Sequence, residues 1–404
     1  MPGWRDLSRL ASELASELAG DARRAVDRAL GKTGAYRAIG YRGYGTADRA
    51  LLLGRVLEHT RIATAEATHT RWRNLLATVQ RIDADPLPFA TVRAILGASA
   101  TPVKADDEGF IRRWLAPAVP LRSGQWHTVD LELVVETDAP ISTAAPLPAR
   151  VLVPSPNVEL GVISDMDDTV LQSEITSFIR AARLMLLENA RTRLPFPGVA
   201  AFYRALERGR RGAAMNPIFY VSSSPWNLHD VIADFLDAQE IPAGPMLLRD
   251  WDIGRDMLRT REYKLAQIRE ILTTYPALPF ILVGDSGQED PEIYGAIVRE
   301  FPGRVLAVYI RNVSQHPERA ESIRRLAQQV SDGGSTLLLA DDTLTAARHA
   351  AAHGWITEDA LPDIGSEKRD DEGTTGAKVE TPGVEPKTAP TIVVDPDVKR
   401  NDVE

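Results

Sequence analysis

The sequence contains no cysteine among its 404 residues. This absence excludes disulfides, thiolate metal ligands and cysteine nucleophiles, so a metal ion would have to be held by oxygen or imidazole ligands. A chain without cysteine also fits a reducing compartment. We therefore expect a cytoplasmic protein, with peripheral attachment to a membrane as an open alternative.

Long apolar runs and an excess of positive charge are missing too. No stretch approaches the roughly 20 uncharged apolar residues of a membrane-spanning helix, so no transmembrane segment is expected. Charged residues recur through the first 17 positions, which is unlike the apolar region of a secretory signal. The net charge of −9 argues against broad nucleic-acid binding, because that affinity depends on neutralising phosphates with Lys and Arg.

The length exceeds that of one ordinary domain, since single domains usually have roughly 100–200 residues. Residues 1–34 are predicted to form an amphipathic helix, because apolar residues recur every three or four positions up to Leu30 and Gly31 follows. Residues 35–155 are predicted to form a β-rich accessory domain, a small sandwich with one helical insert near 70–82.

Two segments support the β-rich assignment. Val129, Leu131 and Leu133 alternate with polar residues, as in a strand with one buried face. The acidic stretch 106–109 is interpreted as a turn between strands, because acid-rich turns are common and its spacing fits no cation site.

Residues 156–360 are predicted to form an α/β domain with a Rossmann-like parallel sheet and helices on both faces, because short apolar segments alternate there with helical ones. The expected strands are 160–163, 218–221, 246–248, 280–283, 305–310 and 337–339. Large apolar residues nearly vanish after about 363, so we expect 361–404 to be a disordered acidic tail.

The first chemical signal is a group of three acids, Asp165, Asp167 and Asp168, directly after a buried strand. Acids at such a position cost stability unless they are used. Ligands of open α/β sheets bind outside the carboxyl ends of the strands, so Asp165 and Asp167 should reach a binding crevice. A calcium loop is excluded, because its fifth and sixth positions would be Thr169 and Val170.

A second strand, 218–221, runs into Ser222, Ser223, Ser224 and Pro225. Ser224 suits a helix N-cap and Pro225 the first helical position, so a helix should begin there. Backbone N–H groups and a hydroxyl at that point can hold a phosphate. Taken alone, a purely capping role fits the segment equally well.

A third strand, 280–283, ends in Gly284 and Asp285, and Asp290 follows five residues later. One carboxylate could bind a cation while the second supports it from behind. Oxygen ligands beside a phosphate favour Mg²⁺. Without partner motifs, a solvated acidic loop would be the alternative.

Lys264 is the only lysine between Lys104 and Lys368. A compact ammonium suits a position among several carboxylate and phosphate oxygens, whereas a guanidinium imposes a planar fork. The alternative is an ordinary surface lysine on a helix over 261–274.

Together these motifs resemble the haloacid-dehalogenase superfamily of phosphotransferases, which has Asp-x-Asp-x-Thr, a Ser after a strand, a Lys and Gly-Asp-x-x-x-x-Asp in this order. The longer wording of the segments 165–169, 220–227 and 284–294 resembles one branch, the actin-patch-associated phosphatidate phosphatases and their bacterial relatives. The resemblance covers about residues 155–345.

The resemblance implies a role for each matching residue. Asp165 would be the nucleophile and Asp167 the general acid and base. Ser222, with Ser223 beside it, would bind a phosphoryl oxygen, and Lys264 would bridge nucleophile and phosphate. A carboxylate at Asp167 is typical of the phosphatases of this superfamily.

The resemblance also implies a Mg²⁺ cofactor. Its ligands would be the Asp165 and Asp285 carboxylates and the Asp167 carbonyl, with Asp290 behind them. Such an ion would neutralise the phosphate so that an anionic nucleophile can attack it.

The substrate class is a phosphate monoester, and the resemblance implies phosphatidate at a membrane surface. The apolar residues between Phe178 and Leu187 could receive acyl chains, or could pack on the sheet instead. Two other functions stay open, a soluble phosphomonoesterase acting on a small metabolite and a non-catalytic lipid- or protein-binding module. The sequence does not indicate an oligomeric state.

Overall fold

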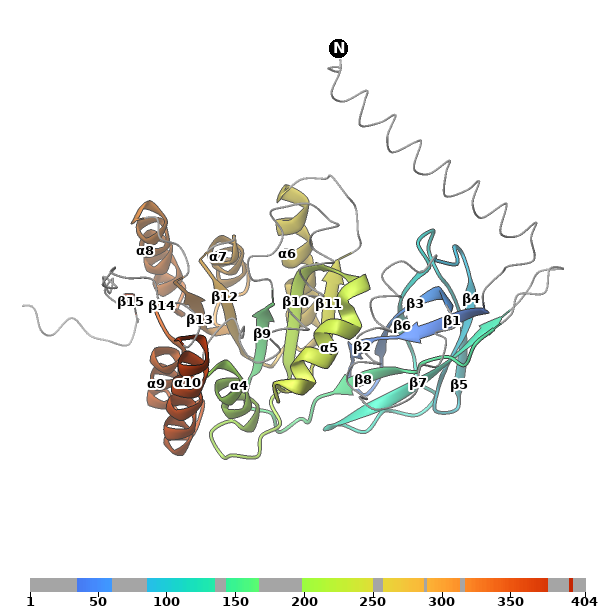
Figure 1. The fold of residues 1–404 in the computed structure, drawn as a ribbon, viewed down its shortest axis with the longest axis horizontal. Helices are drawn as coiled ribbons and strands as arrows, with labels where there is room; N and C mark the ends of the chain where they lie inside the picture. The colour runs from blue at the N-terminus through green and yellow to red at the C-terminus, as the bar shows by residue number, and fades with distance from the viewer. Residues whose placement is uncertain are drawn as a thin grey trace, which may run out of the picture.

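The computed structural model describes residues 35–59, 86–134, 143–166, 198–249, 257–286, 289–312, 317–376 and 392–394. The helix predicted over 1–34 and the insert predicted near 70–82 lie outside these residues. The described chain forms two units (Figure 1). The described residues within 35–153 form a unit of strands, here called the accessory unit, and those from 161 onward form an α/β unit.

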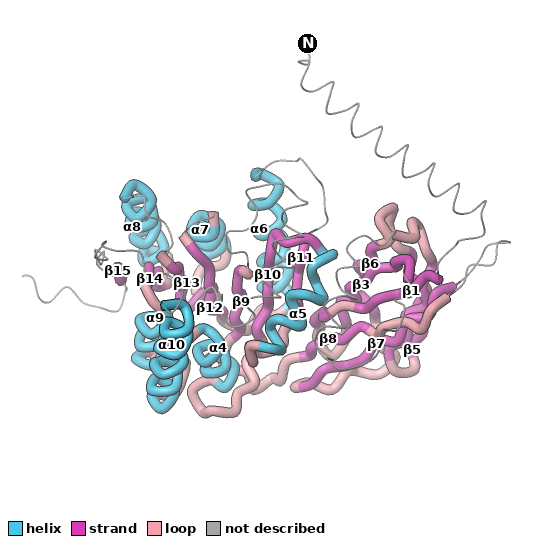
Figure 2. Tube along the Cα trace, viewed as in Figure 1, coloured by secondary structure: helices cyan, strands magenta, loops and turns pink. Residues whose placement is uncertain are grey.

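The accessory unit contains two sheets. One has the order β1-β3-β6 and consists of β1 (Ala35–Gly40), β3 (Ala50–His59) and β6 (Phe110–Leu115), all antiparallel. The other has the order β2-β8-β7-β4-β5 and consists of β2 (Arg42–Tyr44), β4 (Thr91–Leu96), β5 (Ser99–Lys104), β7 (Gln125–Val134) and β8 (Ala149–Val153). The described part of this unit shows only strands and loops (Figure 2).

Side chains from both sheets bury one shared apolar cluster, which includes Leu52 and Val56 of the first sheet and Val92 of the second. The alternation predicted for β7 is confirmed, because Val129 and Leu131 are buried between exposed neighbours. A strand with this pattern covers a core with one face and meets water with the other.

The turn predicted at 106–109 is confirmed as well. The Asp106 carboxylate accepts the backbone N–H groups of Glu108 and Phe110. Gly109 has φ +75, which a residue with a side chain rarely adopts.

The α/β unit is built on six parallel strands in the order β11-β10-β9-β12-β13-β14, with β15 (Ile392–Val394) antiparallel at the edge. The six are β9 (Gly161–Asp165), β10 (Ile218–Pro225), β11 (Met246–Arg249), β12 (Phe280–Asp285), β13 (Val305–Arg311) and β14 (Thr336–Ala340). All six strands expected from the sequence are therefore present, and they pair in parallel.

The helices form two groups. Helices α6 (Met257–Thr274), α7 (Asp290–Glu300) and α8 (Pro317–Asp332) form one group, whereas α4 (Val199–Arg208), α9 (Thr343–Ala352) and α10 (Leu361–Gly376) form another (Figure 1). Helix α5 (His229–Ala238) follows the short η1 (Trp226–Leu228), and η2 (Glu358–Ala360) precedes α10. Among the described residues, no helix is long and apolar enough to cross a membrane.

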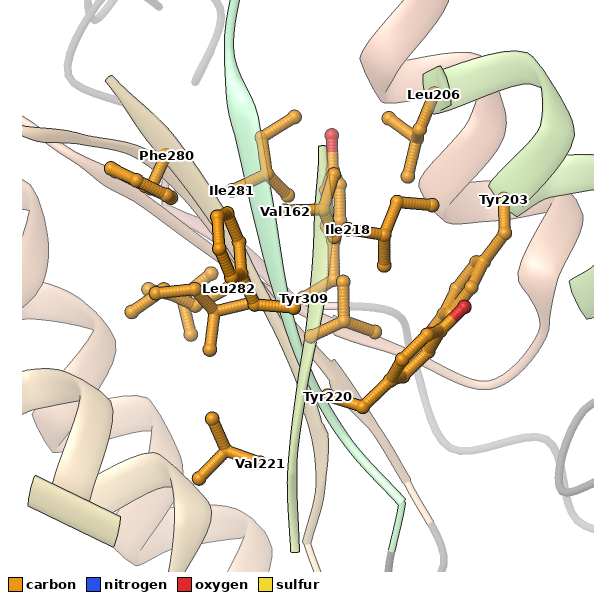
Figure 3. Packing of buried hydrophobic residues seen from close by; sticks show 14 of the residues in the cluster. Val162, Tyr203, Leu206, Ile218, Tyr220, Val221, Phe280, Ile281, Leu282 and Tyr309 are labelled. Atoms are coloured by element: carbon orange, nitrogen blue, oxygen red, sulfur yellow. The ribbon is translucent and has the colours of Figure 1, made fainter. Parts of the chain in front are cut away.

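The strands of the α/β unit are almost continuously apolar because helices cover the sheet. Ile163, Phe219 and Leu282 are fully buried in its core, part of which is drawn in Figure 3. The same cluster continues into the accessory unit, where the Tyr44 ring meets the Phe219 ring edge-on at 5.5 Å. The two units therefore share part of one core.

The disorder expected for 361–404 is wrong for its first part, because Leu361–Gly376 forms α10. Ile364 is fully buried, the Glu367 carboxylate accepts the Ala201 N–H at 2.8 Å, and the Lys368 ammonium donates to Asp342 at 2.6 Å. Glu367 also pairs with Arg204 of α4. Composition averaged over the tail could not reveal that a buried Ile and these polar contacts attach the helix to α4 and to the start of α9.

Replacing the buried Ile364 with alanine should lower the free energy of unfolding by about 2–5 kcal/mol, because it leaves a cavity between α10 and its neighbours. Chemical denaturation of the full chain measures this change. Ser366→Ala is the matched control, since Ser366 is exposed on the same helix and should leave stability nearly unchanged. Equal stability of both variants would show that α10 is not part of the folded core.

Candidate active site

The strand register brings three predicted site residues to one edge of the sheet. Asp165 ends β9, the strand between β10 and β12. Val221 of β10 pairs with Asp165, so Ser222 follows immediately on one side. Val283 of β12 pairs with Ser164, so Asp285 lies on the other side. The carboxyl ends of three adjacent parallel strands thus carry a hydroxyl and two carboxylates, which is where ligands of such sheets bind.

Lys264 of α6 completes this group. Its ammonium donates to Asp165 Oδ1 at 2.8 Å and to Asp290 Oδ1 at 3.0 Å. The Lys264 and Asp165 side chains are each 3% exposed and that of Asp290 is fully buried. The surface alternative for Lys264 is therefore wrong. A buried ammonium is stable only where carboxylates pair with it, as they do here.

Asp165, Asp285 and Asp290 form a group that could hold a metal ion. One carboxylate oxygen from each lies within 4.8 Å of the other two. When ionised, the three carboxylates carry three negative charges, and the Lys264 ammonium balances one of them. The donors are all oxygens, which Mg²⁺ prefers, and a divalent cation would balance the remaining charge.

Asp290 can approach the end of β12 because residue 284 is glycine. A Cβ at Gly284 would lie 2.5 Å from Asp290 Oδ2 and 2.9 Å from Tyr294 Cε2, closer than real contacts allow. The same Asp290 oxygen accepts the Asp285 N–H at 3.3 Å. The Gly-Asp pair of the motif therefore lets the second acid stand directly behind the first.

The serine loop after β10 differs from the prediction at its cap. Pro225 still belongs to β10 and pairs with Arg249, and the helical part begins at Trp226. Ser224 is therefore not a side-chain N-cap. The hydroxyl of the fully buried Ser222 accepts the Ser224 N–H at 2.9 Å, so the first serine supports the loop, whereas the partly buried Ser223 lies between them.

Two buried tyrosines support the strand ends, and the motifs in the sequence predicted a role for neither. The Tyr203 hydroxyl lies 2.6 Å from Ser164 Oγ, which itself donates to the Asp165 carbonyl. The Tyr294 hydroxyl donates to the Val283 carbonyl. Burial raises the pKa of both phenols, and the negative charge of Asp165 raises both pKa values further. Both hydroxyls therefore stay protonated. Tyr294 stands inside the motif 284–294, but no sequence signal marked Tyr203.

Helix α8 supports the loop between β12 and α7. The Arg319 guanidinium pairs with Glu292 through two nitrogens, and its Nε donates to the Ser286 carbonyl at 2.9 Å. Both contacts lie close to Asp285 and Asp290 along the chain. The fork of this guanidinium therefore holds the segment that carries the two carboxylates.

The accessory unit packs against the end of the serine loop. The Tyr41 ring stacks on Trp226 with centroids 4.9 Å apart and also contacts the ring of the buried His229. Phe110 of β6 approaches Trp226 at 6.4 Å. These contacts place Tyr41 and the start of β6 next to the strand ends that carry Asp165 and Ser222, here called the catalytic edge because of the role proposed below.

Two groups of predicted residues lie outside the described residues. They are Asp167 with its neighbour Asp168, and the apolar segment from Phe178 to Leu187. The roles expected for them stay predictions.

The α/β unit is similar to parts of known proteins. Residues 160–312 match the family profile described as the catalytic domain of the phosphatidate phosphatase APP1. The phosphatidate phosphatase APP1 of Saccharomyces cerevisiae is 31% identical over 172 residues, which are 41% of this chain and 28% of the yeast protein. An uncharacterised protein of Schizosaccharomyces pombe is 26% identical over 162 residues, or 38% of this chain and 25% of that protein.

The chain thus matches 25–28% of the length of these relatives. All the matching site residues named above, from Asp165 to Asp290, lie inside the profile match. A carbohydrate acetylesterase from Xanthomonas citri aligns with 72% of this chain and 71% of its own at 13% identity, and its TM-score of 0.23 supports no inference.

Replacing Gly284 with alanine should lower the affinity for Mg²⁺ by about 10–100-fold, because the added methyl pushes Asp290 away from Asp285 and Lys264. Isothermal calorimetry with Mg²⁺ measures the change. Gly365→Ala is the control, since its Cβ would meet nothing closer than 3.6 Å and it stands within α10. Unchanged Mg²⁺ binding in Gly284→Ala would contradict the proposed role of this close approach.

Proposed function

We propose that this chain is a Mg²⁺-dependent phosphatase that forms an aspartyl-phosphate on Asp165, and that its substrate is phosphatidate, cleaved to diacylglycerol and phosphate. The observation that carries this proposal is the buried ammonium of Lys264 between Asp165 and Asp290, in a group of carboxylates that includes Asp285. Ser222 follows the neighbouring strand β10 at the same level. The match of residues 160–312 to a phosphatidate phosphatase catalytic domain supports the substrate.

Asp165 has the surroundings that a carboxylate nucleophile needs. The Lys264 ammonium donates to Asp165 Oδ1, which favours the ionised form of the carboxylate. The Ser164 hydroxyl donates to the Asp165 backbone carbonyl. The side chain and the backbone of Asp165 are therefore both held by hydrogen bonds. The other oxygen of the Asp165 carboxylate would attack phosphorus. This would break the bond to the substrate alcohol and leave the phosphoryl group on Asp165.

The Ser222 loop and Lys264 would bind the phosphoryl oxygens. Backbone N–H groups after β10 and a positive charge can stabilise the negative charge that these oxygens carry in the transition state. Mg²⁺, when held by Asp165 and Asp285, supplies further charge neutralisation. Asp290 holds Lys264 and Asp285 in place, because its carboxylate accepts hydrogen bonds from the Lys264 ammonium and the Asp285 N–H.

Asp167 is the proposed general acid and base. It stands two residues beyond the nucleophile, where a carboxylate can protonate the leaving oxygen. The same group could then take a proton from the water that cleaves the aspartyl phosphate. The strand order β11-β10-β9-β12-β13-β14 supports the Rossmann-like haloacid-dehalogenase fold in which this arrangement is expected.

The match to a phosphatidate phosphatase catalytic domain favours a lipid substrate over a soluble phosphate ester. The intact group of acids counts against a non-catalytic binding module.

Asp165→Asn should reduce turnover of phosphatidate to background while the melting temperature changes little, because the amide is nearly isosteric but cannot attack phosphorus. Phosphate release is measured from phosphatidate in mixed micelles, with Mg²⁺ and with EDTA. Mass spectrometry of the protein trapped with beryllium fluoride should place the adduct on Asp165. An adduct on Ser222 would overturn the mechanism.

The substrate class is tested with the wild-type chain. Sugar and nucleotide phosphates and a small chromogenic ester are compared with phosphatidate at equal concentration. Efficient cleavage of a soluble ester without cleavage of phosphatidate would establish a soluble phosphomonoesterase instead. EDTA-resistant cleavage would remove the metal from the proposal.

Lys264→Arg should lower kcat by roughly 100-fold although it keeps the charge, because a planar fork cannot occupy the position of one nitrogen between two carboxylates. The chromogenic ester provides the rate and thermal unfolding provides the control for folding. Full activity of this variant would show that a point charge at this position is not required.

A further inference from the structure

An exposed apolar turn projects from the accessory unit at residues 86–90. Phe89 is 58% exposed, the neighbouring Pro88 is exposed, and Leu87 is half-buried. Large apolar side chains with high exposure are few among the described residues; they are Phe89, Val119, Val134 and Met215. More than half of the Phe89 side chain is therefore left in contact with water.

The backbone at Phe89 is strained as well. Its φ is +55, in the left-handed region that favours glycine or asparagine and is unfavourable for a bulky residue. The turn is nevertheless well anchored, because the Leu87 N–H donates to Val56 and the Phe89 N–H donates to Asp106. A strained backbone at an exposed aromatic residue motivates a functional hypothesis for that residue.

This turn lies at the same end of the accessory unit as the catalytic edge. The Asp106 N–H donates to the Phe110 carbonyl, and the Phe110 ring contacts Trp226 directly after the serine loop. The opposite end of β6 contacts the far end of α6, where the Trp114 indole donates to Glu270. Phe89 and the strand ends that carry Asp165 and Ser222 therefore lie toward one side of the molecule.

The charged side chains near the turn are Lys104 and the acidic segment 106–108, in which Asp107 is exposed. The Lys104 ammonium lies 5.5 Å from the centre of the Phe89 ring, a cation–π contact. Among the nearby acids, Asp106 accepts hydrogen bonds within its turn and Glu108 lies 4.0 Å from Arg55. With acids beside one lysine, attachment would depend on apolar contact and not on net charge.

We propose that the turn 86–90 is a membrane-docking element that inserts Phe89 into the interface of a lipid bilayer and presents the catalytic edge to lipid substrate. The choice of a bilayer as partner rests on the proposed phosphatidate phosphatase activity. Docking itself is a property of the accessory unit and can be measured without turnover.

The test is co-sedimentation of the full chain with phosphatidylcholine vesicles, with and without phosphatidate. Phe89→Asn should reduce partitioning to both vesicles by about tenfold or more, because burial of a phenyl group is lost. Asparagine accepts a positive φ, so this variant should keep or raise the melting temperature. Phe89→Trp should restore partitioning, and raised salt should change it little.

Val119→Asn is the matched control. Val119 is 70% exposed. The Leu121 N–H of its loop donates to the Ala47 carbonyl just before β3, whereas the Phe89 turn is bonded to Val56 near the other end of β3. Its replacement should leave vesicle binding unchanged. Both variants should cleave a soluble chromogenic ester like the wild type, whereas Phe89→Asn should cleave vesicle-bound phosphatidate more slowly.

Wild-type chain that stays in the supernatant, or equal partitioning of Phe89→Asn and wild type, would overturn the docking element and leave the phosphatase proposal standing. If partitioning is lost only in Phe89→Asn but the wild type does not cleave phosphatidate, the docking element is supported and the lipid substrate is overturned.

Discussion

The ion pairs of Lys264 with Asp165 and Asp290 are the interactions on which the rest of the site depends. Each carboxylate is almost completely buried, and a buried carboxylate is tolerated only if a cation or hydrogen bonds compensate for the lost water. One ammonium compensates for two of them at once. It also connects three elements that are distant in the sequence, namely the end of β9, helix α6 and the start of α7.

Other features of the α/β unit preserve this geometry. Gly284 leaves space for Asp290, Tyr203 and Tyr294 bind the ends of β9 and β12, and Arg319 holds the intervening loop. None of these groups belongs to the proposed set of reacting residues. They restrict the positions of Asp165 and Asp285, which is how a protein can prepare a site before its ligands arrive.

The accessory unit is part of the same structure. Its Tyr44 enters the core of the α/β unit, and its Tyr41 stacks on Trp226 at the end of the serine loop. A separate domain on a flexible linker would not make these contacts. The shared core fixes the side on which the Phe89 turn lies relative to the catalytic edge, so recognition of a surface and chemistry at the strand ends can be coupled by position alone.

The sequence predicted the elements whose signal is local. Strands such as β9 and β12 are buried on both faces, so their apolar runs are visible without a structure, and the polar residues that follow them mark the carboxyl ends. For that reason the clustering of Asp165, Asp285 and Asp290 could be expected, and the rarity of lysine drew attention to Lys264. Expectations based on composition or on caps were less successful, as α10 and the absence of a Ser224 cap show.

The sequence by itself therefore determined the α/β class, the strands that end in polar residues and the residues available for phosphate and metal chemistry. Only the tertiary structure decided which groups support them. The contacts of Tyr203 with Ser164, of Arg319 with Ser286 and of Tyr41 with Trp226 join positions that are far apart in the chain. No periodicity or spacing records such contacts, because they depend on how separate elements pack and not on the local preferences of either segment.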